Sequence, residues 1–303
     1  MGSIWSVRRA RATHLLDRTP HASEILTFYA GLTEAQERVA AQVPAAEWLA
    51  LIRSPESDSP WLRVDTLPLD GLALPFREFL SRVADLGTEQ IREGARTLLS
   101  GDDDGRIDPL RNALSSWREP ELGRGPNPEG EEVEEVESLF GFYARAFLDP
   151  VITSIAQATS THDIASTPET ATAQTSALPN DWTRNSCYVC GGQPQVAVLR
   201  DLSESIGHRS LTCSMCATEW RFQRLTCPHC GETEAGKLPV HTAESIAHVR
   251  VDACTTCSRY IKTVDLRKQG NAVPLVDEMA AVELDLWAQE QGLTKVRTNV
   301  LGL

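Results

Sequence analysis

The sequence lacks cysteine throughout its first 186 residues and lacks lysine throughout its first 150. It has no uninterrupted apolar run near the roughly 18 residues of a membrane-spanning helix, so we expect no membrane insertion. Its N-terminal segment has no apolar stretch long enough for a secretory signal, so we expect a cytoplasmic protein. Aromatic residues make up 6% and hydrophobic residues 41% of the 303 positions, a globular composition that excludes collagen-like and fully disordered chains.

Positive charge is also scarce in this chain. It has 29 basic and 42 acidic residues, which give a formal net charge of −13. Residues 1–150 contribute −10 of this charge, and residues 151–303 contribute −3. Domains that hold nucleic acid through its phosphates usually carry a basic stripe, so the balance argues against a nucleic-acid partner. The acidic N-terminal surface is compatible with a monomer.

Helical spacing of apolar residues dominates the N-terminal half. It predicts one helix over residues 25–43, a second over 76–98, and a third over about 131–148 that Pro150 breaks or kinks. The acidic run Asp102–Asp104 lacks the glycine and glutamate spacing of a calcium loop, so we expect an ordinary loop there.

All eight cysteines fall into four C-x-x-C pairs within residues 187–257. The pairs are separated by 22, 10 and 23 residues, which indicates two tandem copies of one unit. The word Glu-Ser-Ile recurs at Glu204 and Glu244, each 17 positions after the first cysteine of its unit. Gly191 and Gly231 each follow the second cysteine of their unit directly.

Paired cysteines in a reducing compartment are typical metal ligands. Two C-x-x-C turns that face each other make a tetrahedral four-sulfur site, which suits zinc or a single iron. The repeat favours one site per unit, and a cross-braced grouping of the first pair with the third is the alternative. Such sites are usually structural, with redox chemistry as the alternative. The tandem grouping joins Cys187, Cys190, Cys213 and Cys216 in one site, and Cys227, Cys230, Cys254 and Cys257 in the other.

The composition changes again on either side of the cysteine region. Residues 157–180 are rich in Ser, Thr and Ala, as linkers are, and Val249, Val251 and Ala253 alternate with polar residues as in a strand. A helix is expected again from near Pro274. We therefore expect an α+β chain with a helical domain over residues 1–156, a linker over 157–180, four-cysteine units over 181–226 and 227–268, and a C-terminal helix and tail over 269–303.

Four sequence words in this region resemble one protein family. They are CYVCGG, LTCSMCATEWRFQRLTCPHCG, DACTTCSRYIK and the acidic helix LVDEMAAVELDLWAQEQG, and they span about residues 187–292. Together they are similar to the formate dehydrogenase accessory protein family, FdhE. The resemblance implies a cytoplasmic, non-catalytic factor for assembly of active formate dehydrogenase, which contacts the catalytic subunit of that enzyme. It also implies two rubredoxin-like units that hold iron, while the ligands suit zinc equally.

The resemblance further implies residues that meet the partner at the surface or an interface. Ala217 and Ser258 stand where rubredoxin-like turns prefer glycine, which weakens the argument for iron. His208 and His248 are expected beside the sites or at the surface rather than as ligands. The residues implied in partner binding are Glu219, Trp220, Tyr260, Lys262, Asp277 and Asp285.

Two other functions remain open from the residues alone. The first is a tandem zinc ribbon that binds nucleic acid, against which the acidic balance argues. The second is a redox enzyme that uses the metal sites. The chain has no phosphate-binding glycine loop, no G-x-S-x-G nucleophile elbow and no H-E-x-x-H zinc helix, so we expect no catalytic residues.

Overall fold

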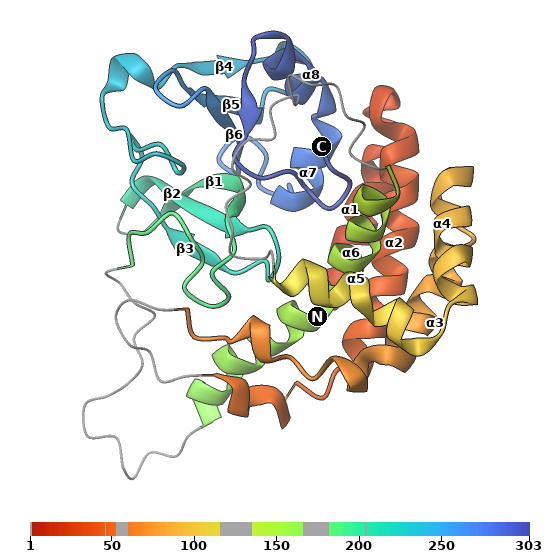
Figure 1. The fold of residues 1–303 in the computed structure, drawn as a ribbon. Helices are drawn as coiled ribbons and strands as arrows, with labels where there is room; N and C mark the ends of the chain where they lie inside the picture. The colour runs from red at the N-terminus through yellow and green to blue at the C-terminus, as the bar shows by residue number, and fades with distance from the viewer. Residues whose placement is uncertain (1, 46, 53–59, 116–134, 166–181, 204) are drawn as a thin grey trace, which may run out of the picture.

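Helices and a mixed sheet occupy opposite sides of the molecule in the computed structural model (Figure 1). The helical side is built from α1 (Ile4–Leu15), α2 (Ser23–Gln42), α3 (Ala73–Val83), α4 (Glu89–Ser100), α5 (Asp103–Ser115) and α6 (Glu135–Ala165). The structure describes residues 2–45, 47–52, 60–115, 135–165, 182–203 and 205–303.

Helix α6 forms the centre of the helical side. Tyr143, Phe147, Val151 and Ile155 recur every four residues and are fully buried, so they form one apolar face. This helix packs against α2, α3 and α5. Its segment Leu139–Ala158 is long and apolar enough to cross a membrane by length and composition, and 61% of it is buried inside the molecule. A helix that is mostly buried in this way is typical of a protein core.

The boundaries of three predicted segments are corrected by the structure. The single helix expected over residues 76–98 is two helices, α3 and α4, because the chain turns at Gly87, whose φ is +72°. The expected loop at Asp102–Asp104 instead begins α5, since the Asp102 carboxylate accepts a hydrogen bond from the Gly105 amide at 2.8 Å and caps the helix.

The third helix was expected to break or kink at Pro150, and the structure shows that it does not break there. Buried residues continue along α6 on both sides of Pro150 as far as Ala156, and the helix itself runs to Ala165. The first part of the expected linker, residues 157–165, is therefore helical. The rest of that linker, residues 166–180, lies outside the described residues.

The sheet joins the two cysteine repeats. Its strands are β1 (Pro194–Leu202), β2 (Ser205–Cys213), β3 (Glu219–Arg221), β4 (Val240–Thr242), β5 (Val249–Cys254), β6 (Arg259–Asp265) and β7 (Thr294–Lys295). They run in the order β3-β2-β1-β6-β5-β4, and β7 pairs with β6. Neighbouring strands within each repeat are antiparallel, whereas β1 and β6 pair in parallel, with Val196 opposite Lys262 and Leu199 opposite Asp265. The two repeats therefore share one sheet.

The C-terminal helices α7 (Pro274–Ala280) and α8 (Val282–Glu290) carry buried carboxylates against this sheet. Glu278 pairs with both Lys262 and Lys295, and Lys295 also lies 3.1 Å from Asp285. Tyr260 donates a hydrogen bond to Asp285 at 2.8 Å. Two lysines and two carboxylates thus neutralise one another in the interior, where an unpaired charge would be costly.

A second buried pair ties the two ends of the chain together. Arg11 of α1 donates to Asp277 of α7 through two hydrogen bonds, of 2.9 and 2.6 Å. His248 lies 2.8 Å from the same carboxylate. Burial alone would raise the pKa of Asp277, but the hydrogen bonds from His248 and Arg11 lower it. The helical side is therefore fixed to the sheet through α7.

The substitution Glu278→Gln should destabilise the protein strongly, because it leaves two buried lysines short of a counter-charge. We expect the free energy of unfolding, measured by urea denaturation, to fall by about 3 to 5 kcal/mol. The control Glu290→Gln changes an exposed glutamate of α8, and it should alter stability by less than about 0.5 kcal/mol. Equal losses of unfolding free energy in the two variants would contradict a large contribution of the buried ion pairs to stability.

The same glutamate should make stability depend on pH. Burial would raise the pKa of Glu278, but Lys262 and Lys295 lower it from 4.5 to about 2. A lowered folded-state pKa contributes stability that is complete above the unfolded value and is lost as the pH falls through the folded value. The unfolding free energy of the wild type should therefore fall more steeply than that of Glu278→Gln between pH 4.5 and about 2. Parallel pH profiles would contradict this assignment.

Candidate metal centre

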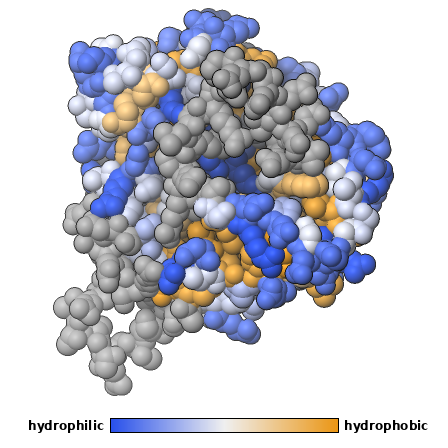
Figure 2. All heavy atoms as spheres, in the orientation of Figure 1, coloured by the Kyte–Doolittle hydropathy of each residue, from blue (hydrophilic) through white to orange (hydrophobic). Residues whose placement is uncertain are grey.

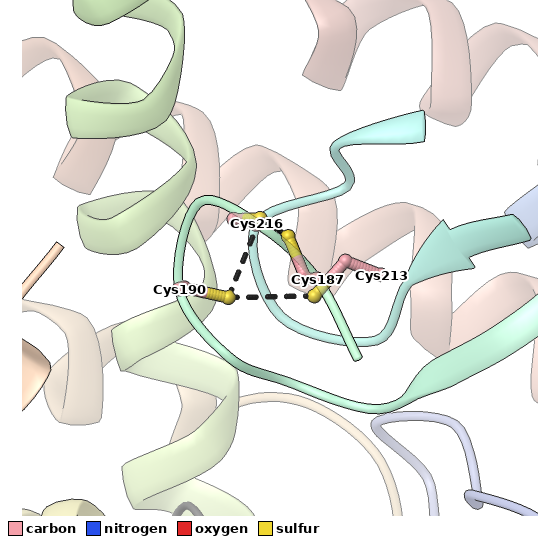
Figure 3. Close-up of side chains that lie close together, drawn as sticks. All are labelled: Cys187, Cys190, Cys213 and Cys216. Atoms are coloured by element: carbon pink, nitrogen blue, oxygen red, sulfur yellow. Dashed lines mark hydrogen bonds between the residues drawn. The ribbon is translucent and has the colours of Figure 1, made fainter. Parts of the chain in front are cut away.

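The first four-sulfur site lies between two turns that flank β1 and β2. Cys187 and Cys190 come from the turn before β1, and Cys213 and Cys216 come from the turn that ends β2. Their side chains point toward one another (Figure 3). The sulfur atom of Cys190 lies 3.5 Å from those of Cys213 and Cys216, and the sulfur of Cys187 lies 3.5 Å from that of Cys216. A tetrahedral ion with metal–sulfur bonds of about 2.3 Å requires sulfurs about 3.8 Å apart, so this spacing fits zinc or iron.

The second site repeats this arrangement in the next unit. The sulfur atoms of Cys227 and Cys257 are 3.8 Å apart, and those of Cys230 and Cys254 are 3.7 Å apart. All four ligand atoms of each site lie within 4.8 Å of one another. The structure thus groups the cysteines within each repeat, as the tandem interpretation expects, and not in the cross-braced way. That the cysteines bind metal in the protein stays a prediction.

All four cysteine turns adopt the same left-handed step, whether or not glycine is present. Gly191 and Gly231 have φ of +79°, and Ala217 and Ser258, at the equivalent positions of the other turns, have φ of +53°. Alanine and serine enter this region at an energetic cost that glycine avoids. The absence of glycine after the second and fourth pairs therefore does not change the turn geometry.

Backbone amides and burial shape the chemistry of the thiols. The His229 amide points at the Cys227 sulfur from 3.4 Å. Burial raises the pKa of the Cys190 thiol. Burial also acts to raise the pKa of Cys254, but the amides of Cys257 and Thr256 donate to its sulfur and lower it. Such amide donors stabilise negative charge on sulfur, which a thiolate–metal centre requires. A bound zinc would close each site structurally, and a bound iron would add one-electron redox chemistry.

The surroundings of the two sites differ. All four cysteines of the first site are buried, and the helical side covers their turns. The Leu62 amide donates to the Val189 carbonyl at 2.7 Å, and the Thr153 hydroxyl of α6 donates to the Met215 carbonyl at 3.3 Å. In the second site Cys230 is exposed and Cys257 is half-buried. Solvent therefore reaches the second site more directly than the first.

Five of the six residues implied in partner binding are buried, so the expectation of surface positions is wrong for them. Tyr260, Lys262 and Asp285 belong to the ion cluster under α8, and Asp277 pairs with Arg11. Trp220 is buried and donates its indole N–H to the Arg184 carbonyl at 3.1 Å. These groups are covered because each has a partner within the chain.

Glu219 is the one residue of that set with a partly exposed side chain. It accepts a hydrogen bond from Arg200 at 2.7 Å. A role for Glu219 in partner binding stays a prediction. His208, His229 and His248 lie outside both four-sulfur sets, and His248 instead contacts Asp277.

Sequence reasoning missed the residues that hold the C-terminal helices in place. Glu278 and Lys295 were not singled out, although both are buried and paired. The signal that could have found them is the charge pattern. Glu278 is one of two acids that interrupt the otherwise apolar stretch Leu275–Val282. Lys295 carries no such signal, because its burial depends on the pairing of β7 with β6.

Comparisons with known proteins agree with this architecture. Residues 186–224 match the model of the FdhE central domain, and residues 225–301 match that of the FdhE C-terminal domain. Residues 186–301 are thus similar to two consecutive domains of the FdhE family. Each family domain contains one four-cysteine unit, and the C-terminal domain also includes α7, α8 and β7, so the resemblance found in the sequence is confirmed.

Relatives within the FdhE family extend the comparison. The "Protein FdhE homolog" of Aquifex aeolicus is 42% identical over 121 residues, which span 40% of this chain and 43% of that protein. The match thus spans less than half the length of that relative. The homolog of Stutzerimonas stutzeri is 27% identical over 302 residues, or 98% of this chain and 89% of that protein.

A solved structure of the FdhE family shares the fold. The crystal structure of the FdhE protein from Pseudomonas aeruginosa superposes with a TM-score of 0.71, over 98% of this chain and 95% of that one. The sequences are 21% identical, so this match shows the fold alone. It includes the helical side, which the two family models do not cover.

The difference in burial predicts that the two sites release metal at different rates. A colorimetric chelator added to the zinc-loaded protein should remove one equivalent from the second site faster, by on the order of tenfold, because its surroundings are open. The substitution Cys230→Ser should abolish the fast phase, and Cys190→Ser should abolish the slow phase. Release of both equivalents at one rate would contradict the assignment.

Proposed function

We propose that this chain is an accessory factor needed to assemble active formate dehydrogenase, and that its double four-cysteine module binds the catalytic subunit of that enzyme. The observation that carries the proposal is that each of the two matched FdhE domains contains one four-sulfur unit. The relatives named "Protein FdhE homolog" support the family resemblance on which this role rests.

The geometry supports a binding role rather than catalysis. Each site has four cysteine ligands, and a tetrahedral ion that holds four protein ligands has no open position for a substrate. Metal binding then supplies folding energy to units too small to bury a large core, on the order of 10 kcal/mol for structural zinc. On this proposal the module is a rigid surface for a protein partner.

The more accessible unit of the module is the second. The helical side covers the turns of the first site, whereas Cys230 of the second site is exposed. We therefore propose that the partner approaches from the second unit. In that arrangement the first site fixes the module to the helical side, and the second site lies at the surface that meets the partner.

Complementation in the native host tests the role of the second site. A strain without this gene should lose formate dehydrogenase activity, and the wild-type gene should restore it. The double variant Cys254→Ser/Cys257→Ser should fail to restore activity, whereas the control Thr255→Ala, between the same cysteines, should succeed. Circular dichroism of the purified variants checks that both fold. Full formate dehydrogenase activity in the deletion strain would refute the proposed function.

An affinity purification of the tagged protein tests the partner. The catalytic subunit of formate dehydrogenase should be recovered with the wild type and with Thr255→Ala. Recovery of nucleic acid or ribosomal proteins in its place would favour the tandem-ribbon alternative and contradict the proposed partner.

A further inference from the structure

A cavity of about 210 Å³ lies directly beside the second four-sulfur site. Cys227 and Cys254 contribute to its wall, and the segment 224–228 and strands β4 to β6 provide most of the rest. One water needs roughly 10 to 15 Å³ of such volume, so the cavity has room for a small ligand. Metal binding by the cysteines does not require this cavity, and the family comparisons give it no role.

The cavity concentrates positive charge in a strongly acidic chain. Four arginines line it, and the wall contains a single carboxylate among the described residues, that of Asp252. A divalent ion held by four thiolates would add two negative charges nearby. Even with those charges counted, the cavity keeps a positive surplus. The four arginines are Arg209, Arg224, Arg250 and Arg259.

The carboxylate of the wall is already shared among several donors. Arg250 donates to Asp252 through bonds of 2.8 and 3.4 Å, and Thr263 donates to it at 2.8 Å. A guanidinium nitrogen of Arg209 lies 3.6 Å from the same group. Asp252 therefore orients Arg250 and Arg209, and it makes no ion pair with Arg224 among the described residues.

Arg209 is held rigidly at the base of the cavity. It is buried, and one of its terminal nitrogens donates to the carbonyls of Gln223 and Thr226, both at 3.0 Å. Its Nε has no hydrogen-bond partner in the part of the chain that the structure describes. That Nε is itself shielded from solvent, so Arg209 contributes a fixed, preorganised positive charge to the cavity wall rather than a free donor.

Arg224 and two apolar side chains form the outer wall. Arg224 is exposed, and its carbonyl accepts a hydrogen bond from Arg209 at 3.4 Å, while its guanidinium makes no ion pair or hydrogen bond among the described residues. Leu225 and Val240 beside it are 62% and 50% exposed. On the face seen in Figure 2, apolar residues lie next to hydrophilic ones at the end of the molecule where Figure 1 shows β4. The opening thus offers both a cation and an apolar surface.

We propose that this cavity binds a small ligand that bears a carboxylate or a phosphate. Its oxyanion would lie among the guanidinium groups of Arg224, Arg250 and Arg209, and any apolar part would rest on Leu225 and Val240. Planar guanidinium groups match both oxyanions through paired hydrogen bonds. The inference holds whether or not the chain serves formate dehydrogenase.

Calorimetric titration of the metal-loaded, full-length protein tests this site. Inorganic phosphate and butyrate serve as separate probes at constant ionic strength, with chloride as the background anion. We expect saturable binding of one equivalent of at least one probe. Tighter binding of phosphate would identify a phosphate ligand, and tighter binding of butyrate would identify a carboxylate with an apolar tail.

Matched arginine variants show whether the cavity is responsible. Arg224→Gln should weaken binding by about tenfold, the loss of one charge-assisted hydrogen bond. Arg221→Gln removes the same charge from an exposed arginine of β3 outside the cavity, and it should leave binding unchanged. In crystals soaked with selenate, the anomalous selenium signal should lie in the cavity.

Three results would overturn the proposal. The first is the absence of saturable binding with either probe. The second is equal weakening by Arg221→Gln and Arg224→Gln, which would indicate a general charge effect. The third is loss of metal from Arg224→Gln with unchanged anion binding, which would mean that the arginine only balances the metal–thiolate charge.

Discussion

Eight sulfur atoms held at contact distance are the constraint on which the C-terminal half of this molecule depends. Within each repeat the sulfurs approach to between 3.5 and 3.8 Å, a spacing that suits a tetrahedral cation. Each site brings together the two cysteine turns of its own unit, one from each C-x-x-C pair. The first site also fixes the turns that the Leu62 amide and the Thr153 hydroxyl contact, so its closure extends to the helical side.

Buried ion pairs hold the C-terminal helices against the sheet that carries the two four-sulfur sites. The carboxylates of α7 and α8 pair with lysines of β6 and β7, and Asp277 reaches Arg11, which lies 266 positions away in the sequence. Desolvation makes such groups costly, and pairing offsets that cost only where the geometry is well defined. The cluster therefore specifies one position for the C-terminal helices, and through α7 it sets the position of α1 as well.

The cysteine repeat made the candidate metal sites predictable, whereas the arrangement around them was not. Spacing identified the eight candidate ligands, the repeat favoured the grouping that the structure shows, and alternation at Val249, Val251 and Ala253 identified β5. The parallel pairing of β1 with β6 leaves no local pattern, because it depends on how the two repeats meet. Helix α1 was missed because its buried face includes Arg8 and Arg11, which break the apolar periodicity. Asp277 and Asp285 look like a solvated acidic face until their distant partners are known.

The central claim is that each repeat closes around its own metal ion. X-ray absorption spectroscopy combined with elemental analysis of the protein purified without oxygen tests it most directly. The account predicts two metal ions per chain, each with four sulfur neighbours at about 2.3 Å. A single ion per chain, a nitrogen or oxygen ligand in the first coordination shell, or disulfides in place of thiolates would contradict it.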